Sequence, residues 1–246
     1  MLDAILDPSV RPVVLGTAAL GAITGAVGTF AVVRRQALLG DAVSHAALPG
    51  VALAFLVGAA SPAWLAVGAA VAGWLAMAGV GAVARSSRVP FDAALAGALA
   101  AFFGFGLAAM GYLRRHVPGA AEHGLDRYLF GQAAILRDDD LWSILGFGGL
   151  ALLAVGLCWK ELKAVSFDPD FAASLGFPTR MLDLLLTGLV VVGVVIGLQA
   201  VGVVLMSALV VAPAVAARQW TDRLGRVVCL AAVLGAAAGA CGTLLS

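Results

Sequence analysis

Residues 181–200 read MLDLLLTGLVVVGVVIGLQA, a stretch in which Asp183 is the one charged side chain. About twenty apolar residues in an α-helix cross the roughly 30 Å hydrocarbon core of a bilayer. Lipid offers no hydrogen bonds to backbone amides, so a single crossing segment satisfies its own backbone only as a helix. This stretch therefore predicts a membrane-spanning helix.

Seven further apolar stretches flank it, each bounded by charged residues, turn residues or the chain end. They cover about residues 12–33, 41–60, 63–84, 91–113, 141–159, 203–217 and 227–245. Composition supports the same interpretation, because 62% of the residues are hydrophobic and 12% are charged, against about 25% charged in soluble domains. The sequence therefore predicts an all-α, polytopic transmembrane helical bundle, with residues 1–246 forming one domain of about eight spans.

Two segments do not fit this pattern of spans. Residues 128–136 are apolar but too short to cross, which predicts a re-entrant or interfacial helix. Residues 164–180 form a polar stretch after the fifth span. With the N-terminus outside, ten of the 15 lysines and arginines fall on the inner side, as the positive-inside rule requires. This orientation makes residues 164–180 cytoplasmic.

The cytoplasmic stretch contains the signals of a short helix. Asp168 suits the N-cap, Pro169 the first helical position, and Asp170 the positive end of the helix dipole. Gly176 suits the left-handed position that ends a helix. About two helical turns are predicted between these residues.

Phe171 and Leu175 are four residues apart, so they share one face of this short helix. A capped helix with an apolar knob in a cytoplasmic loop is suited to docking on another protein. The alternative is an ordinary loop with one helical turn on the membrane surface.

The second span begins with a polar group of residues. Asp41, Ser44 and His45 follow the i, i+3, i+4 spacing of one helix face, and the sequence beyond is apolar. Ionisable residues that enter a membrane helix are costly and usually face a cavity or a partner. Carboxylate oxygen with imidazole nitrogen suits manganese or zinc. The alternative is that Asp41 caps the helix while Ser44 and His45 bond to a neighbouring helix.

Two prolines within spans remove backbone donors. Pro49 leaves the carbonyl of His45 without its helical donor, which frees an oxygen for a cavity, water or ion. Pro213 does the same for Leu209 and predicts a kink.

Further ligands would have to come from water or from other helices. Weaker pathway candidates are Gln199, Glu122 and His123. The plainer interpretation of Gln199 is an interhelical hydrogen bond. For Glu122 and His123 it is a solvated loop.

Several stretches resemble one known family. Residues 39–52, LGDAVSHAALPGVA, resemble the signature of the ABC-3 family of metal ABC-transporter permeases, which import zinc, manganese or iron. Stretches 128–131, 167–176 and 202–214 are similar to further family segments in the same order. The resemblance thus extends over nearly the whole chain.

This resemblance implies a homodimeric permease of the type II ABC importer architecture in the bacterial cytoplasmic membrane. Its implied partners are ABC ATPase subunits inside and a metal-binding solute-binding protein outside. No permanently bound cofactor is implied; Mn²⁺ or Zn²⁺ is the cargo, with iron as a further candidate. The resemblance also favours Asp41 and His45 as metal ligands and 168–176 as the ATPase-coupling helix. Family members usually continue through one more membrane helix, which is expected to be absent from this chain.

Other functions make different demands on the sequence. The chain has no GxxxxGK[ST] motif, so an ATPase site of its own is not expected and energy must come from a partner. A proton-coupled metal transporter needs carboxylates deep in several spans, and the spans here are nearly bare. A membrane metalloenzyme would need a HEXXH-like cluster, which the sequence lacks. A permease for siderophores or cobalamin remains an alternative on architecture.

Overall fold

The computed structural model describes residues 10–58, 61–116, 131, 136 and 138–245. The helices in this part of the chain, with no strand among the described residues, are α2 (Arg11–Val33), α3 (Leu39–Leu56), α4 (Pro62–Ser86), α5 (Phe91–His116), α7 (Asp138–Leu157), α8 (Trp159–Phe167), α9 (Pro169–Ser174), α10 (Thr179–Arg218) and α11 (Leu224–Leu245). Seven of these described helices are long and apolar enough to cross a membrane. The predicted all-α transmembrane bundle is confirmed.

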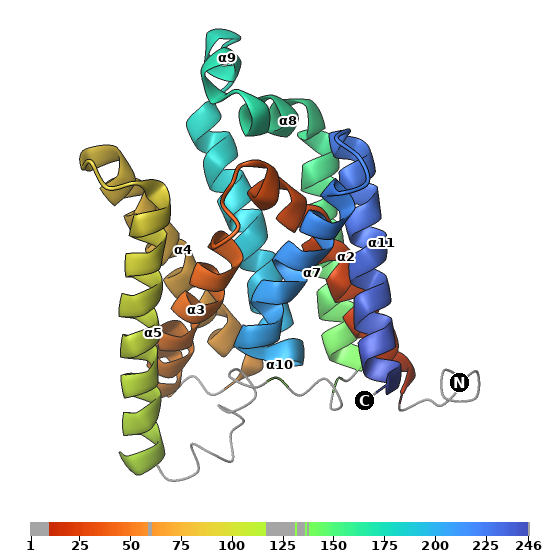
Figure 1. Cartoon of the computed structure of the whole chain (residues 1–246). Coiled ribbons are helices and arrows are strands. Elements are labelled where there is room, and N and C mark those ends of the chain that lie inside the picture. Colours follow the sequence, from red (N-terminus) through yellow and green to blue (C-terminus); the bar gives the residue numbers. More distant parts are fainter. Residues whose placement is uncertain (1–9, 59–60, 117–130, 132–135, 137, 246) are drawn as a thin grey trace.

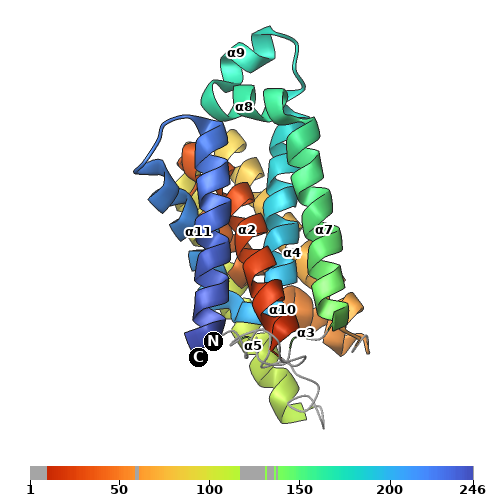
Figure 2. The ribbon, with the colours of Figure 1, turned by 90° about the vertical axis from the view of Figure 1, so that its right-hand side faces the viewer.

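The long helices run side by side along one axis, while α8 and α9 lie across one end of the bundle (Figures 1 and 2). We call this the α8–α9 end. The C-terminus lies at the opposite end. Seen in the two perpendicular views, the molecule is therefore an elongated bundle with a cap of short helices on one end.

The helix α10 is interrupted at Gly202, whose φ of 74° and ψ of 173° are not helical. A straight helix of 40 residues would be about 60 Å long, twice the thickness of the hydrocarbon core. Instead, Figure 1 shows the first part descending from α9 and the second part returning toward the α8–α9 end. The break falls between the two spans expected at 181–200 and 203–217.

Burial separates the central helices from the peripheral ones. In the most apolar windows of α2 and α3, 78% and 72% of residues are buried, against 17% in both α5 and α11. Close backbone approach makes this packing possible. A Cβ atom added at Gly50 of α3 would overlap the carbonyl oxygen of Gly68 in α4, and one added at Gly21 of α2 would overlap that of Gly235 in α11. Small residues at such crossings are typical of membrane helix packing.

The basic residues are sorted between the two ends of the bundle. The ten that the sequence places inside lie in α8 itself or next to the ends of helices that reach the α8–α9 end in Figure 1: Arg34, Arg35, Arg85, Arg88, Lys160, Lys163, Arg180, Arg218, Arg223 and Arg226. Arg11, Arg114 and Arg115 lie at the opposite end, where α2 begins and α5 finishes. This separation agrees with an α8–α9 end that faces the cytoplasm.

Candidate functional site

The polar residues of α3 lie in its first two turns. The helix begins at Leu39, two residues earlier than expected, and its N-cap Leu38 makes no side-chain capping bond. Asp41 is therefore the third helical residue and not the cap. The capping alternative for Asp41 is wrong in this structure, although a carboxylate in the first turn still interacts favourably with the helix dipole.

Asp41 and His45 form a pair. Nε2 of His45 lies 3.3 Å from Oδ1 of Asp41, and their side chains are 15% and 35% exposed respectively. Two ligand atoms about 2.1 Å from one metal ion, and 3.3 Å from each other, subtend an angle of about 104° at the metal. That angle is close to tetrahedral. A separation of this size is compatible both with a direct contact between the two side chains and with two ligands of one metal ion.

The imidazole of His45 is held from the other side by α5. Its ring meets the ring of Phe103 edge-on, with centroids 4.4 Å apart and an interplanar angle of 68°. The Nδ1 atom is buried and has no hydrogen-bond partner among the described residues. An imidazole that packs against Phe103 in this way keeps Nε2 directed toward Asp41.

The pair lies deep within the bundle. Eleven residues separate His45 from the end of α3 at Leu56, which corresponds to about 16 Å of helix. This distance is about half the thickness of a bilayer core. An acidic and an imidazole side chain within a membrane-spanning helix are a functional-site hypothesis by default.

Ser44 does not join the pair. It is buried, and its hydroxyl donates to the carbonyl oxygen of Gly40 at 2.7 Å. Hydroxyls of membrane helices commonly bond to the carbonyl four residues earlier. The structure therefore brings together two of the three residues that share the expected face.

The remaining pathway candidates lie elsewhere in the sequence. Gln199 lies on α10, three residues before the break at Gly202. Glu122 and His123 fall outside the described residues, as does most of the expected short helix at 128–136. Within that segment, Gly131 has a φ of 71° and packs against the backbone of Val201 and Gly202.

The two prolines occupy different surroundings. Pro49 is buried within α3, and α5 approaches it closely because Gly106 has no side chain. Pro213 packs near Gly25 of α2. The interruption of α10 lies at Gly202, at the expected boundary between the spans 181–200 and 203–217, because a glycine adopts positive φ without the steric penalty of a side chain. The kink expected at Pro213 stays a prediction.

The short helix α9 has the ends that the sequence predicts. The carboxylate of Asp168 accepts from the backbone N–H of Phe171 at 2.9 Å, and Pro169 is the first helical residue. Gly176 has a φ of 82°, and the N–H of Phe177 donates to the carbonyl of Ala172. These bonds form a Schellman motif that stops the helix.

The side chains of Phe171 and Leu175 are 57% and 55% exposed. By contrast, α8 is anchored: Leu162 and Val165 are buried, and Trp159 meets Phe30 of α2 edge-on. Trp159 therefore begins α8 and does not end the fifth span as expected, because it packs on α2. The result is an apolar knob that projects from a firmly packed base.

Comparison with known proteins places this geometry in a family. The model of the ABC 3 transport family matches residues 7–246. The chain belongs to this family. It is 46% identical over 242 residues to the zinc transport system membrane protein TroC of Treponema pallidum, an alignment covering 98% of this chain and 80% of TroC.

Two further relatives agree. Over 240 residues the chain is 42% identical to the manganese transport system membrane protein MntC of Bacillus subtilis, covering 97% of this chain and 55% of MntC. The solved structure of PsaBC from Streptococcus pneumoniae in complex with Fab superposes with a TM-score of 0.83 at 29% identity, covering 96% of this chain and 82% of that one. The chain is thus a multi-pass membrane protein of a metal-transport family.

Proposed function

We propose that this chain is the permease subunit of an ATP-binding-cassette importer, and that it carries manganese or zinc past Asp41 and His45 into the cytoplasm. The observation that supports this most directly is the 3.3 Å pair at mid-depth in α3. Relatives named for zinc and for manganese transport support both cargoes.

Two protein ligands bind a divalent ion incompletely. Zinc and manganese take four or more donors, and among the described residues no group of three His, Cys, Asp or Glu side chains is close enough to hold a metal. In a symmetric homodimer with its pathway on the twofold axis, a second copy contributes the same two side chains. Water completes the remainder, which suits a site that must release its ion.

Energy comes from a separate subunit. The relatives are named as membrane or permease proteins of transport systems, and the chain has no P-loop sequence, which supports a permease role with ATP hydrolysed by a partner. The exposed Phe171 and Leu175 on α9 form the contact with a cytoplasmic ATPase. The permease lies in the bacterial cytoplasmic membrane. The end of the bundle opposite α8 and α9 receives the metal from an extracytoplasmic solute-binding protein.

The proposal is tested by reconstitution. The permease, its ATPase and its binding protein are placed in proteoliposomes, and uptake of radioactive manganese and zinc is measured with and without ATP. We expect saturable, ATP-dependent uptake of at least one of the two ions. Uptake driven by a proton gradient without ATP would instead identify a secondary transporter, and uptake of a metal–siderophore complex but not of the free ion would identify a chelate permease.

A further inference from the structure

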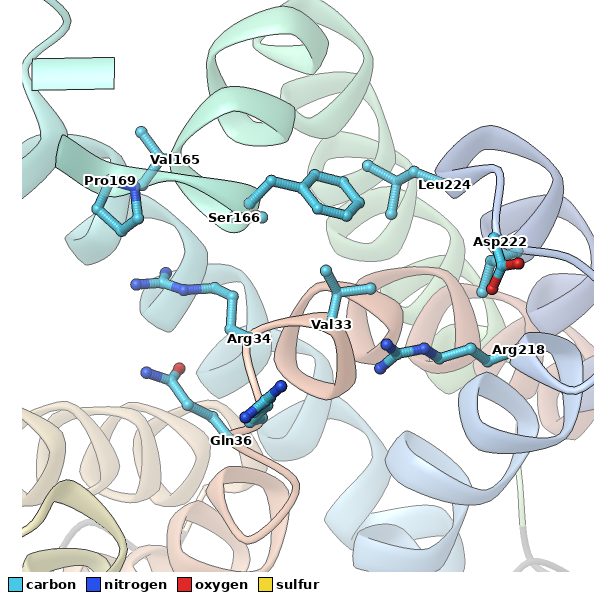
Figure 3. A pocket seen from close by; sticks show the side chains of 12 residues that line it. Val33, Arg34, Gln36, Val165, Ser166, Pro169, Arg218, Asp222 and Leu224 are labelled. Atoms are coloured by element: carbon cyan, nitrogen blue, oxygen red, sulfur yellow. The ribbon is translucent and has the colours of Figure 1, made fainter. Parts of the chain in front are cut away.

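A cavity of about 610 Å³ opens at the α8–α9 end, distinct from the Asp41–His45 pair. Its walls are the turn between α2 and α3, the end of α8, the end of α10 and the start of α11 (Figure 3). Its polar lining consists of Arg34, Arg35, Gln36, Ser166, Arg218 and Asp222. We call it the arginine cavity.

The charges of the arginine cavity are unbalanced. Three arginines face one acidic residue, Asp222. The charge of Arg34 is balanced by a residue that does not line the cavity, because its guanidinium donates to Asp183 of α10 at 2.6 Å. Figure 3 shows Arg34 extending toward α10, whereas Arg218 extends from the opposite wall toward Val33. Among the described residues, neither Arg35 nor Arg218 has an ion-pair partner.

The backbone at Arg35 provides an independent observation. Its φ of 59° makes it the one described residue other than glycine with positive φ. Its N–H donates to Val32, and the N–H of Gln36 donates to Ala31, so Arg35 occupies the Schellman position that glycine normally fills. An L-residue there costs about 1 kcal/mol relative to glycine. Such strain at an exposed residue suggests that its side chain has a function.

The remaining walls suit a phosphate group with an organic substituent. The first residue of α11, Leu224, lines the cavity, so the positive end of a 22-residue helix faces it. Val33, Val165, Phe167 and Val227 provide apolar surface beside the arginines. Guanidinium groups bind phosphate oxygens in a bidentate manner, and basic pockets at the cytoplasmic membrane surface bind anionic headgroups.

We propose that the arginine cavity binds a phosphate group through Arg35 and Arg218, either that of an anionic lipid headgroup or free phosphate. This inference goes beyond metal transport and does not depend on it. Binding at this level would tie together the turn before α3 and the end of α10, which are the two segments that carry these charges.

The test uses the detergent-purified permease in complex with its ATPase. Thermal stability is measured while a short-chain phosphatidylglycerol, a matched phosphatidylcholine or sodium phosphate is titrated. The test protein is the double variant Arg35→Gly/Arg218→Gln, and the matched control is Arg88→Gln, a cytoplasmic-end arginine outside the cavity. Arg35→Gly also relieves the positive φ, so the unliganded midpoint of the single variant should not fall.

We expect saturable stabilisation of the wild-type complex, with an apparent affinity about tenfold or more weaker in the double variant and unchanged in the control. A response to phosphatidylglycerol but not to phosphate assigns the site to headgroups, and a response to both assigns it to the phosphate group alone. The proposal is overturned if neither phosphatidylglycerol nor phosphate stabilises the wild-type complex saturably. It is also overturned if Arg88→Gln weakens the apparent affinity as much as the double variant does. Loss of ATPase copurification without any phosphate response would make the cavity a docking site for the ATPase and would also overturn it.

Discussion

Asp183 and Asp41 are carboxylates of two transmembrane helices, and their partners differ. Asp183 on α10 is bound at 2.6 Å by Arg34 of α2, a guanidinium that is always charged. Asp41 on α3 lies 3.3 Å from His45 of the same helix, a side chain that can be neutral and can itself bind a metal. The first carboxylate is occupied by a permanent cation and joins two helices. The second has no permanent cation beside it, and in the proposed function it is the one that meets the passing metal ion.

The largest expected effect is loss of transport when the Asp41–His45 pair is changed. Asp41→Asn keeps the shape of the side chain but removes its charge, and we expect metal uptake to fall about 100-fold or more at normal membrane abundance. Asp41→Ala and His45→Ala should do the same. Uptake of radioactive manganese or zinc, normalised to permease quantified by immunoblot, measures this. If the Asp41→Asn permease takes up metal as well as the wild type, Asp41 is not a metal ligand.

A second effect should arise far from the pair, at the knob on α9. Phe171→Asp places a charge on the exposed apolar face, and we expect ATP-driven uptake to fall about tenfold or more while the fold is retained. Copurification of the ATPase and the ratio of ATP hydrolysed to metal transported report the loss of coupling. Lys163→Gln, at an exposed position of the neighbouring α8, is the control and should transport normally. If the Phe171→Asp permease copurifies with the ATPase and takes up metal like the wild type, α9 is not the coupling element.

The structural carboxylate should respond differently from the transporting one. Asp183→Asn breaks the pair with Arg34, and we expect a fall of about 2–4 °C in the unfolding midpoint, with uptake per folded molecule changed less than about threefold. The exchange Arg34→Asp/Asp183→Arg should recover part of the stability. An uptake defect in Asp183→Asn as deep as that of Asp41→Asn would erase the distinction between the two carboxylates.

The smallest effect is expected at Ser44. Its hydroxyl is buried and donates to the carbonyl of Gly40, so Ser44→Ala should change metal uptake less than about twofold and stability by about 1 kcal/mol or less. Uptake and thermal unfolding measured together separate the two quantities. A large loss of uptake at unchanged stability would show that Ser44 turns toward the ion during transport.

Local features of the structure could be predicted well from the sequence. Apolar runs predicted the helices, and Asp168 and Gly176 predicted the ends of α9, because caps depend on neighbouring residues alone. The pairing of Asp41 with His45 followed from helical spacing. Even the position of the break in α10 matched an expected boundary, although the glycine that makes it was not singled out.

Features that depend on packing could not be predicted in the same way. The bond between Arg34 and Asp183 joins residues 149 positions apart, and the edge-on contact of Phe103 with His45 joins α5 to α3. Both depend on which helices become neighbours, which spacing along the chain does not determine. The same is true of Trp159, which starts a new helix because its ring packs on α2.

The direct succession of α9 and α10 has a mechanical consequence. Only four residues, 175–178, separate the end of α9 from Thr179, and Asp183 lies about one helical turn further. The connection itself is not helical, and Asp183 lies in the first turns of α10. One ion pair joins Asp183 to Arg34 and the turn that precedes α3. The pair thus acts as a staple between the end of α2 and the start of α10, at the point where the chain enters the bundle from α9.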